Sequence, residues 1–166
     1  MGFNIDFITL YDRPSYNLEF QFEHLCLHIS ENANQAKRAG QILRSVHHVN
    51  MWIKRRESQN GPYALITSHL QMAQFLTRVC SVSSRAIYVM HGAQWPYDPN
   101  KSLLYRLYLH AVYGRRMISC VSQGLKSELV NDYGFRSDDV TVVYNPIPLP
   151  RVDKTFDPKI NGPYFC

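Results

Sequence analysis

The chain has 166 residues, a net charge of +5 at pH 7 and 45% hydrophobic residues. This length suits one domain of ordinary size, and the composition excludes a disordered tail and a coiled coil. No apolar run approaches the roughly 18 residues of a membrane span, and no secretory signal is recognisable. The positive charge suits an anionic partner, whether phosphate, membrane surface or nucleic acid.

Strand-like and helix-like segments alternate along the chain. Short apolar runs predict strands over residues 4–10, 24–29, 63–67, 85–90, 117–121 and 140–144. Apolar residues at helical spacing predict helices over residues 34–57, 71–79, 101–113 and 122–133. Such β–α alternation predicts an α/β fold, a Rossmann-like parallel sheet with helices on both faces.

The domain prediction follows the same segments. Residues 1–150 are expected to form one incomplete Rossmann-like domain, and residues 151–166 a linker and the truncated start of another domain. The chain opens on a strand without the Gly-rich turn that usually precedes it in a doubly wound domain. We therefore expect a fragment of a larger protein.

Small and polar residues follow the predicted strands, where open α/β sheets bind their ligands. These residues are Ser68, His69, His91, Gly92, Ser122 and Asn145. Glycine lets a ligand approach the backbone, a serine N-cap leaves helix amides for an anion, and histidine moves protons near neutral pH. The structural alternatives stay open, because a serine after a strand is often only an N-cap and a histidine can serve the core.

No metal or cofactor site is predicted. Walker A, complete G-x-G-x-x-G, G-x-S-x-G and H-E-x-x-H motifs are absent from the sequence. The histidines lack nearby carboxylates or cysteines that would complete a metal site. The scattered cysteines are Cys26, Cys80, Cys120 and Cys166, a pattern that favours reduced thiols in the cytoplasm over a disulfide framework.

Basic residues gather in two places. The long helix carries Lys37, Arg38, Arg44, Lys54, Arg55 and Arg56, and a second group is Arg106, Arg115 and Arg116. Each group is either a solvated face or a surface for anionic lipid or a phosphate-bearing acceptor.

Several motifs, in order along nearly the whole chain, together resemble one known family. Residues 117–134 (MISCVSQGLKSELVNDYG) and 140–147 (VTVVYNPI) resemble the end of the N-terminal domain of family 4 glycosyltransferases, where a strand ending in V-S leads to a helix, a glycine and a strand ending in N-P-I. Residues 64–70 (ALITSHL) and 88–92 (YVMHG) are similar to two earlier strands of the family. Residues 1–10 are similar to the stretch after its first helix.

The resemblance implies a GT-B fold, in which two Rossmann-like domains face each other across a cleft. It implies hexosyl transfer from a nucleotide-sugar donor with retention of configuration, and no obligatory metal. His91 matches the cleft histidine near the donor sugar and phosphate, and Gly92 matches the small residue beside it. The family's Gly-rich first loop and its C-terminal domain have no counterpart here, so the chain by itself is expected to be inactive.

The implied acceptor is a glycan or a lipid-linked glycan in surface polysaccharide or lipopolysaccharide synthesis. The implied location is the cytoplasm, peripheral on the inner face of the membrane. One alternative is another GT-B enzyme such as a nucleotide-sugar epimerase, which should carry more carboxylates at its strand ends. A second is a non-catalytic basic binding module, although no nucleic-acid motif appears and no nucleic-acid partner is predicted.

Overall fold

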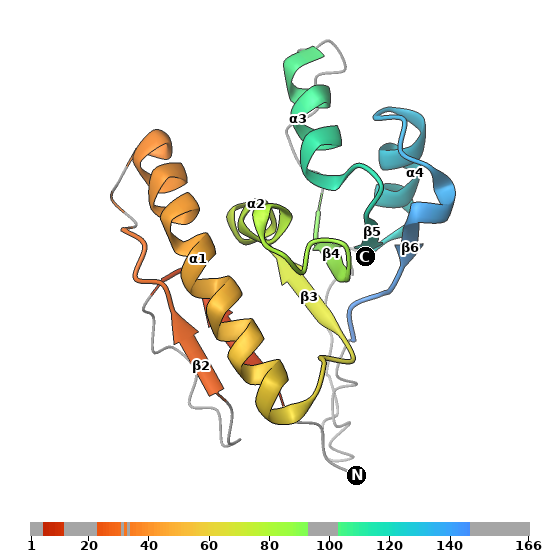
Figure 1. Ribbon diagram of the computed structural model, residues 1–166. Helices are drawn as coiled ribbons and strands as arrows, with labels where there is room; N and C mark the ends of the chain where they lie inside the picture. The colour runs from red at the N-terminus through yellow and green to blue at the C-terminus, as the bar shows by residue number, and fades with distance from the viewer. Residues whose placement is uncertain (1–4, 12–22, 31, 33, 93–102, 147–166) are drawn as a thin grey trace, which may run out of the picture.

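Parallel strands and helices alternate through the computed structural model, which describes residues 5–11, 23–30, 32, 34–92 and 103–146 (Figure 1). In chain order the elements are β1 (Asp6–Thr9), β2 (Glu23–Cys26), α1 (Gln35–Asn60), β3 (Ile66–His69), α2 (Gln71–Val79), β4 (Ala86–Met90), α3 (Leu103–Tyr113), β5 (Met117–Cys120), α4 (Gln123–Asn131), a 3₁₀ turn (Ser137–Asp139) and β6 (Val140–Val142). The α/β, Rossmann-like class predicted from the sequence is confirmed.

The strands form two parallel sheets rather than one. The first pairs β1 with β2, and the second has the order β3–β4–β5–β6. Among the described residues no ladder joins β1 to β3. One hydrophobic cluster nevertheless contains Ile8 of β1, Leu25 of β2 and Ile66 of β3 together with Ile42 and Val49 of α1. Packing against α1, the long connection between β2 and β3 in Figure 1, therefore joins the two sheets.

Local signals account for the ends of α1. The Asn34 side chain accepts a hydrogen bond from the Lys37 amide at 2.9 Å, as an N-cap residue does. Gly61 ends the helix with a φ of 84°, a conformation that favours glycine. The sequence predicts this end from Asn60-Gly61-Pro62, and the observed helix reaches Asn60.

Strand β3 begins later than its sequence predicts, at Ile66 instead of residue 63. The Tyr63 amide donates to Glu57 Oε1 at 3.2 Å, and its hydroxyl donates to Asp6. These bonds hold Tyr63 against α1 and β1, so it cannot take part in the ladder of β3.

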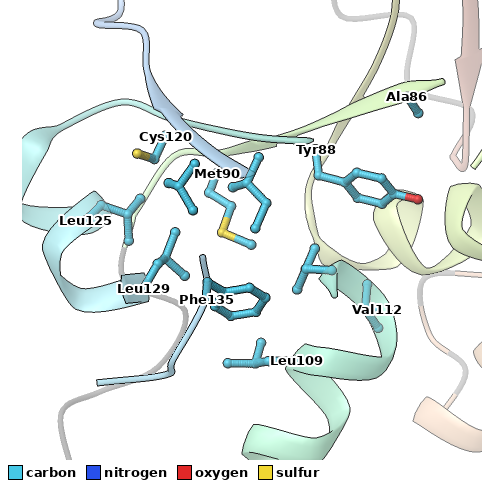
Figure 2. Packing of buried hydrophobic residues seen from close by; sticks show 12 residues of the cluster. Ala86, Tyr88, Met90, Leu109, Val112, Cys120, Leu125, Leu129 and Phe135 are labelled. Carbon is cyan, nitrogen blue, oxygen red and sulfur yellow. The ribbon is translucent and has the colours of Figure 1, made fainter. Parts of the chain in front are cut away.

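The second hydrophobic cluster lies between the four-stranded sheet and helices α3 and α4. Alternate residues of β4, Ala86, Tyr88 and Met90, are buried, as expected for one face of a strand. Figure 2 shows Phe135 among the side chains of Leu129, Leu109 and Met90. This core holds β4 and β5 in place beneath their carboxyl ends.

A partly buried ion pair ties α1 to β1. Arg56 donates to both carboxylate oxygens of Asp6, at 2.9 and 3.1 Å. Burial acts to raise the pKa of the Asp6 carboxyl, but hydrogen bonds from Arg56 and Tyr63 outweigh it, and the pKa lies below its ordinary value. Burial and the neighbouring carboxylate raise the pKa of the Tyr63 hydroxyl, so it remains a donor at neutral pH.

Asp6→Asn is expected to lower the free energy of unfolding at pH 7. A carboxyl with a lowered pKa in the folded state stabilises the protein above its unfolded pKa of about 3.9, and this contribution disappears as the pH falls through the folded value. Urea unfolding of both proteins between pH 7 and about pH 3 should show the gap closing at the acid end.

The control is Asp138→Asn, because Asp138 is exposed and lies 3.8 Å from Arg136, which is exposed too. Its replacement should change stability little at any pH. A stability gap for Asp6→Asn that stays constant down to pH 3 would contradict the role given to its charge.

The predicted boundary between residues 150 and 151 lies outside the described residues. Within the described ranges, no helix is both long enough and apolar enough to cross a bilayer.

Candidate functional site

The carboxyl ends of β3, β4, β5 and β6 lie along one edge of the sheet, because all four strands are parallel. We call this edge the rim. Its residues are His69, His91, Gly92, Ser122 and Asn145. His69 ends β3, His91 directly follows β4, and Ser122 and Asn145 come two and three residues after β5 and β6.

The structure brings His69 and His91 into direct contact. Nδ1 of His69 and Nε2 of His91 are 2.9 Å apart and share a hydrogen bond. The two rings stack with their centroids 5.2 Å apart and their planes at 27°. In the ladder His69 lies opposite Val89, so His91, two residues further on, belongs to the same face of the sheet.

A third side chain bonds the far nitrogen of His69. Nε2 of His69 lies 3.3 Å from the Thr67 hydroxyl, two residues earlier on β3. Burial and the charge of His91 both lower the pKa of His69. His69 is therefore neutral at pH 7, with one ring nitrogen able to donate and the other able to accept.

A buried glutamine holds the two strands just before the histidines. The Gln74 side chain donates to the carbonyl oxygens of Ser68 and Val89, at 3.3 and 2.8 Å. Its own oxygen accepts from the Tyr113 hydroxyl at 2.8 Å. Gln74 is 1% exposed, so these bonds form away from water. It thereby fixes the spacing of β3 and β4 directly below the histidine pair.

Ser68 is not brought to the rim, contrary to the sequence prediction. Its side chain is buried, and its hydroxyl accepts a hydrogen bond from the Thr77 hydroxyl at 2.9 Å. The alternation of the strand explains this, because His69 is exposed and its neighbour must then face α2. Ser68 therefore supports the packing of α2 on β3.

Gly92 is exposed beside His91, as the sequence predicts for a strand end. A Cβ built on Gly92 would meet no atom of the described residues within 4 Å. The described part of the chain thus leaves open space at this position. The role of Gly92 in ligand approach stays a prediction.

Ser122 and Asn145 lie further along the rim. The Ser122 hydroxyl accepts from the Leu125 amide at 3.2 Å, so it caps α4. Val121 donates to the Met90 carbonyl at 3.3 Å, so the chain just before Ser122 runs beside the end of β4. Asn145 is exposed two strands away from β4, roughly 10 Å at ordinary strand spacing. Ser122 thus follows the strand that adjoins β4, and Asn145 extends the same edge.

Some residues of the two predicted basic groups form bonds within the fold. Arg56 is bound to Asp6, and Arg116 donates to the Ser83 hydroxyl at 3.1 Å. The members that remain exposed are Lys37, Arg44, Lys54, Arg55, Arg106 and Arg115. These are the side chains available to an anionic partner.

Sequence reasoning missed Thr67 and Gln74. A glutamine among the apolar residues of α2 was the available signal for Gln74, because a buried amide needs partners. Among the described residues, no three histidine, cysteine, aspartate or glutamate side chains gather as metal ligands would.

Comparison with known proteins identifies a family and solved structures to which the chain is similar. Residues 1–151 match the model of the family described as Glycosyltransferase Family 4. The chain is similar to a glycosyltransferase from Rickettsia africae ESF-5, with 15% sequence identity and a TM-score of 0.47. That similarity covers 76% of this chain but 30% of the other. No curated protein sequence matches the chain.

Proposed function

Because the chain belongs to Glycosyltransferase Family 4, we propose that it is the acceptor-side half of a hexosyltransferase. This enzyme moves a sugar from a nucleotide-sugar donor to a glycan or lipid-linked acceptor, with retention of configuration. The observation that carries the proposal is the family match, which extends over residues 1–151. The pathway is surface polysaccharide synthesis, at the cytoplasmic face of the membrane.

The rim is where the donor meets this domain. His91 contacts the donor sugar or its phosphate, and the open space at Gly92 admits them. When the glycosidic bond to the phosphate breaks, negative charge develops on the leaving nucleoside diphosphate. A histidine hydrogen bond and the free amides at the start of α4, which Ser122 caps, favour that charge. Asn145 and His69 complete the polar edge.

A transfer assay tests this proposal in the protein that contains residues 1–166. Labelled nucleotide sugars are supplied with a bacterial lipid extract, and the label in lipid or glycan is measured. The expected product keeps the donor's anomeric configuration, determined by NMR. A product of inverted configuration would overturn retention, and conversion of one nucleotide sugar into another without an acceptor would favour the epimerase alternative.

We also expect the 166-residue chain by itself to transfer no sugar. It spans 30% of the chain of the similar glycosyltransferase, and the remaining length of such an enzyme supplies the nucleotide pocket in this proposal. Residues 1–150 would then form the acceptor-side domain and residues 151–166 the link to the donor side. Turnover of any sugar nucleotide by the purified chain would contradict this division.

The chain is expected to bind anionic lipid vesicles. The exposed basic residues of α1, among them Arg44, Lys54 and Arg55, attract anionic headgroups, and salt screens that attraction. Co-sedimentation should therefore occur with phosphatidylglycerol vesicles at low salt and be lost at about 1 M salt. Substitution of these three residues by glutamine should weaken it, whereas equal binding to neutral vesicles would exclude an electrostatic mechanism.

A further inference from the structure

The partner of His91 is unusual for a functional histidine, because it is a second imidazole. A catalytic histidine commonly has its second nitrogen held by a carboxylate or a backbone carbonyl. Here the 2.9 Å bond joins Nε2 of His91 to Nδ1 of His69. One ring must donate and the other accept, so a single proton lies between the two nitrogens.

The Thr67 hydroxyl supports either direction of that bond. If His69 donates through Nδ1, its Nε2 accepts from Thr67, and if His69 accepts, its Nε2 donates to Thr67 across 3.3 Å. A hydroxyl group can either donate or accept, so it fits both arrangements. The His69 ring is thus held at both nitrogens, which keeps it in position to orient His91.

Burial opposes a positive charge on His69, and no carboxylate of the described residues acts on its pKa. The elements next to the histidines are α2, β5 and the start of α4. On α2 the ionisable side chain is Arg78, which donates to the Ala111 carbonyl at 2.6 Å. On β5 it is Cys120, whose pKa is raised by burial, and on the first turn of α4 it is Lys126. Glu128, one turn further along α4, interacts with Asp132 and Tyr133 instead. None of the groups that face the pair is a carboxylate. The neighbouring charge that lowers the pKa of His69 is that of His91.

We propose that His69 is a positioning residue for His91, and that the hydrogen bond between them makes the two imidazoles share one proton. Neighbouring imidazoles that interact in this way titrate as a pair rather than singly. The consequence rests on the proposed function: His91 meets the donor phosphate with its ring held in a fixed orientation. The pair then carries at most one positive charge near neutral pH.

The test is NMR of the imidazole nitrogens in this chain. In the wild type, Nε2 of His91 should have the chemical shift of a hydrogen-bonded nitrogen, with cross-relaxation between the two rings. His69→Phe keeps a ring but removes the bond, so the His91 shifts should change. His69→Asn places an amide where Nδ1 lies and should restore them. His48→Phe, at an exposed position on α1, is the control and should leave them unchanged.

A second readout concerns the shared proton. His91→Phe removes the neighbouring charge, so the pKa of His69 should rise towards the ordinary value of about 6.5. An unchanged His69 titration in this variant would overturn the shared proton. Identical His91 shifts in the wild type and in His69→Phe would overturn the positioning role. If the variants fail to fold, the wild type alone tests the proposal. Absence of cross-relaxation between its two rings would overturn the positioning role.

These measurements need no sugar donor, so they separate the two proposals. Loss of the ring pairing in a protein that still transfers sugar would overturn only the inference about His69. A paired, proton-sharing His69 and His91 in this chain, together with no sugar transfer by the enzyme that has both domains, would overturn only the proposed function.

Discussion

His91→Ala is expected to lower kcat by about 10²–10³-fold in a preparation with measurable sugar transfer. The variant loses a hydrogen-bond donor to the charge that develops on the leaving phosphate, and such donors contribute on the order of 3–4 kcal/mol to the transition state. Because His91 is exposed at the end of β4, the melting temperature should change little. Both quantities are measured on the same protein.

His110→Ala is the matched control for this experiment. His110 bonds the Tyr133 carbonyl at 2.8 Å and stacks on Phe135 with centroids 4.6 Å apart. Its loss should lower the free energy of unfolding by about 1 kcal/mol and leave kcat unchanged. If His91→Ala instead behaves as His110→Ala does, with a lower melting temperature and the same kcat, His91 is a structural residue.

Gln74→Leu is expected to cost about 3 kcal/mol of unfolding free energy. Leucine of similar size leaves the carbonyls of Ser68 and Val89 and the hydroxyl of Tyr113 without this partner, and each buried polar group left unpaired costs about 1–3 kcal/mol. Urea unfolding followed by circular dichroism measures the loss. The His69 and His91 rings should also lose their fixed spacing.

Tyr113→Phe provides the comparison, because it removes one of the same three hydrogen bonds. Alone it should cost about 1 kcal/mol. In the Gln74→Leu background it should cost much less, since the hydroxyl no longer has its acceptor. Additive costs for the two substitutions would mean that the bond between Gln74 and Tyr113 does not contribute to stability.

Most element positions could be predicted from the sequence because their signals are local. The helix from Gln71 to Val79 has its predicted bounds, and Asn34, Gly61 and Ser122 cap helices where their residue types predict it. Each of these features depends on residues within one or two turns of each other. The start of β3 moved because the Tyr63 hydroxyl bonds Asp6, 57 residues earlier in the chain.

The sequence predicted which residues share the rim, but not which of them are in contact. Parallel pairing places every carboxyl end on the same side, so His69, His91, Ser122 and Asn145 were expected there before their contacts were known. The contact between His69 and His91 needs more than this rule. It depends on the register that sets His69 opposite Val89, and on rings that turn towards each other across two strands.

The sequence by itself determined the α/β class, the order of strands and helices, and the polar character of the rim, because these follow from hydrophobic periodicity and local capping. Only the tertiary structure decided which side of β3 Ser68 faces, where the Gln74 amide finds partners, and that β1 and β3 lie in separate sheets. These features depend on hydrogen bonds and packing between residues distant in the chain. A pattern with a period of two or 3.6 residues carries no information about which distant group will meet a given side chain.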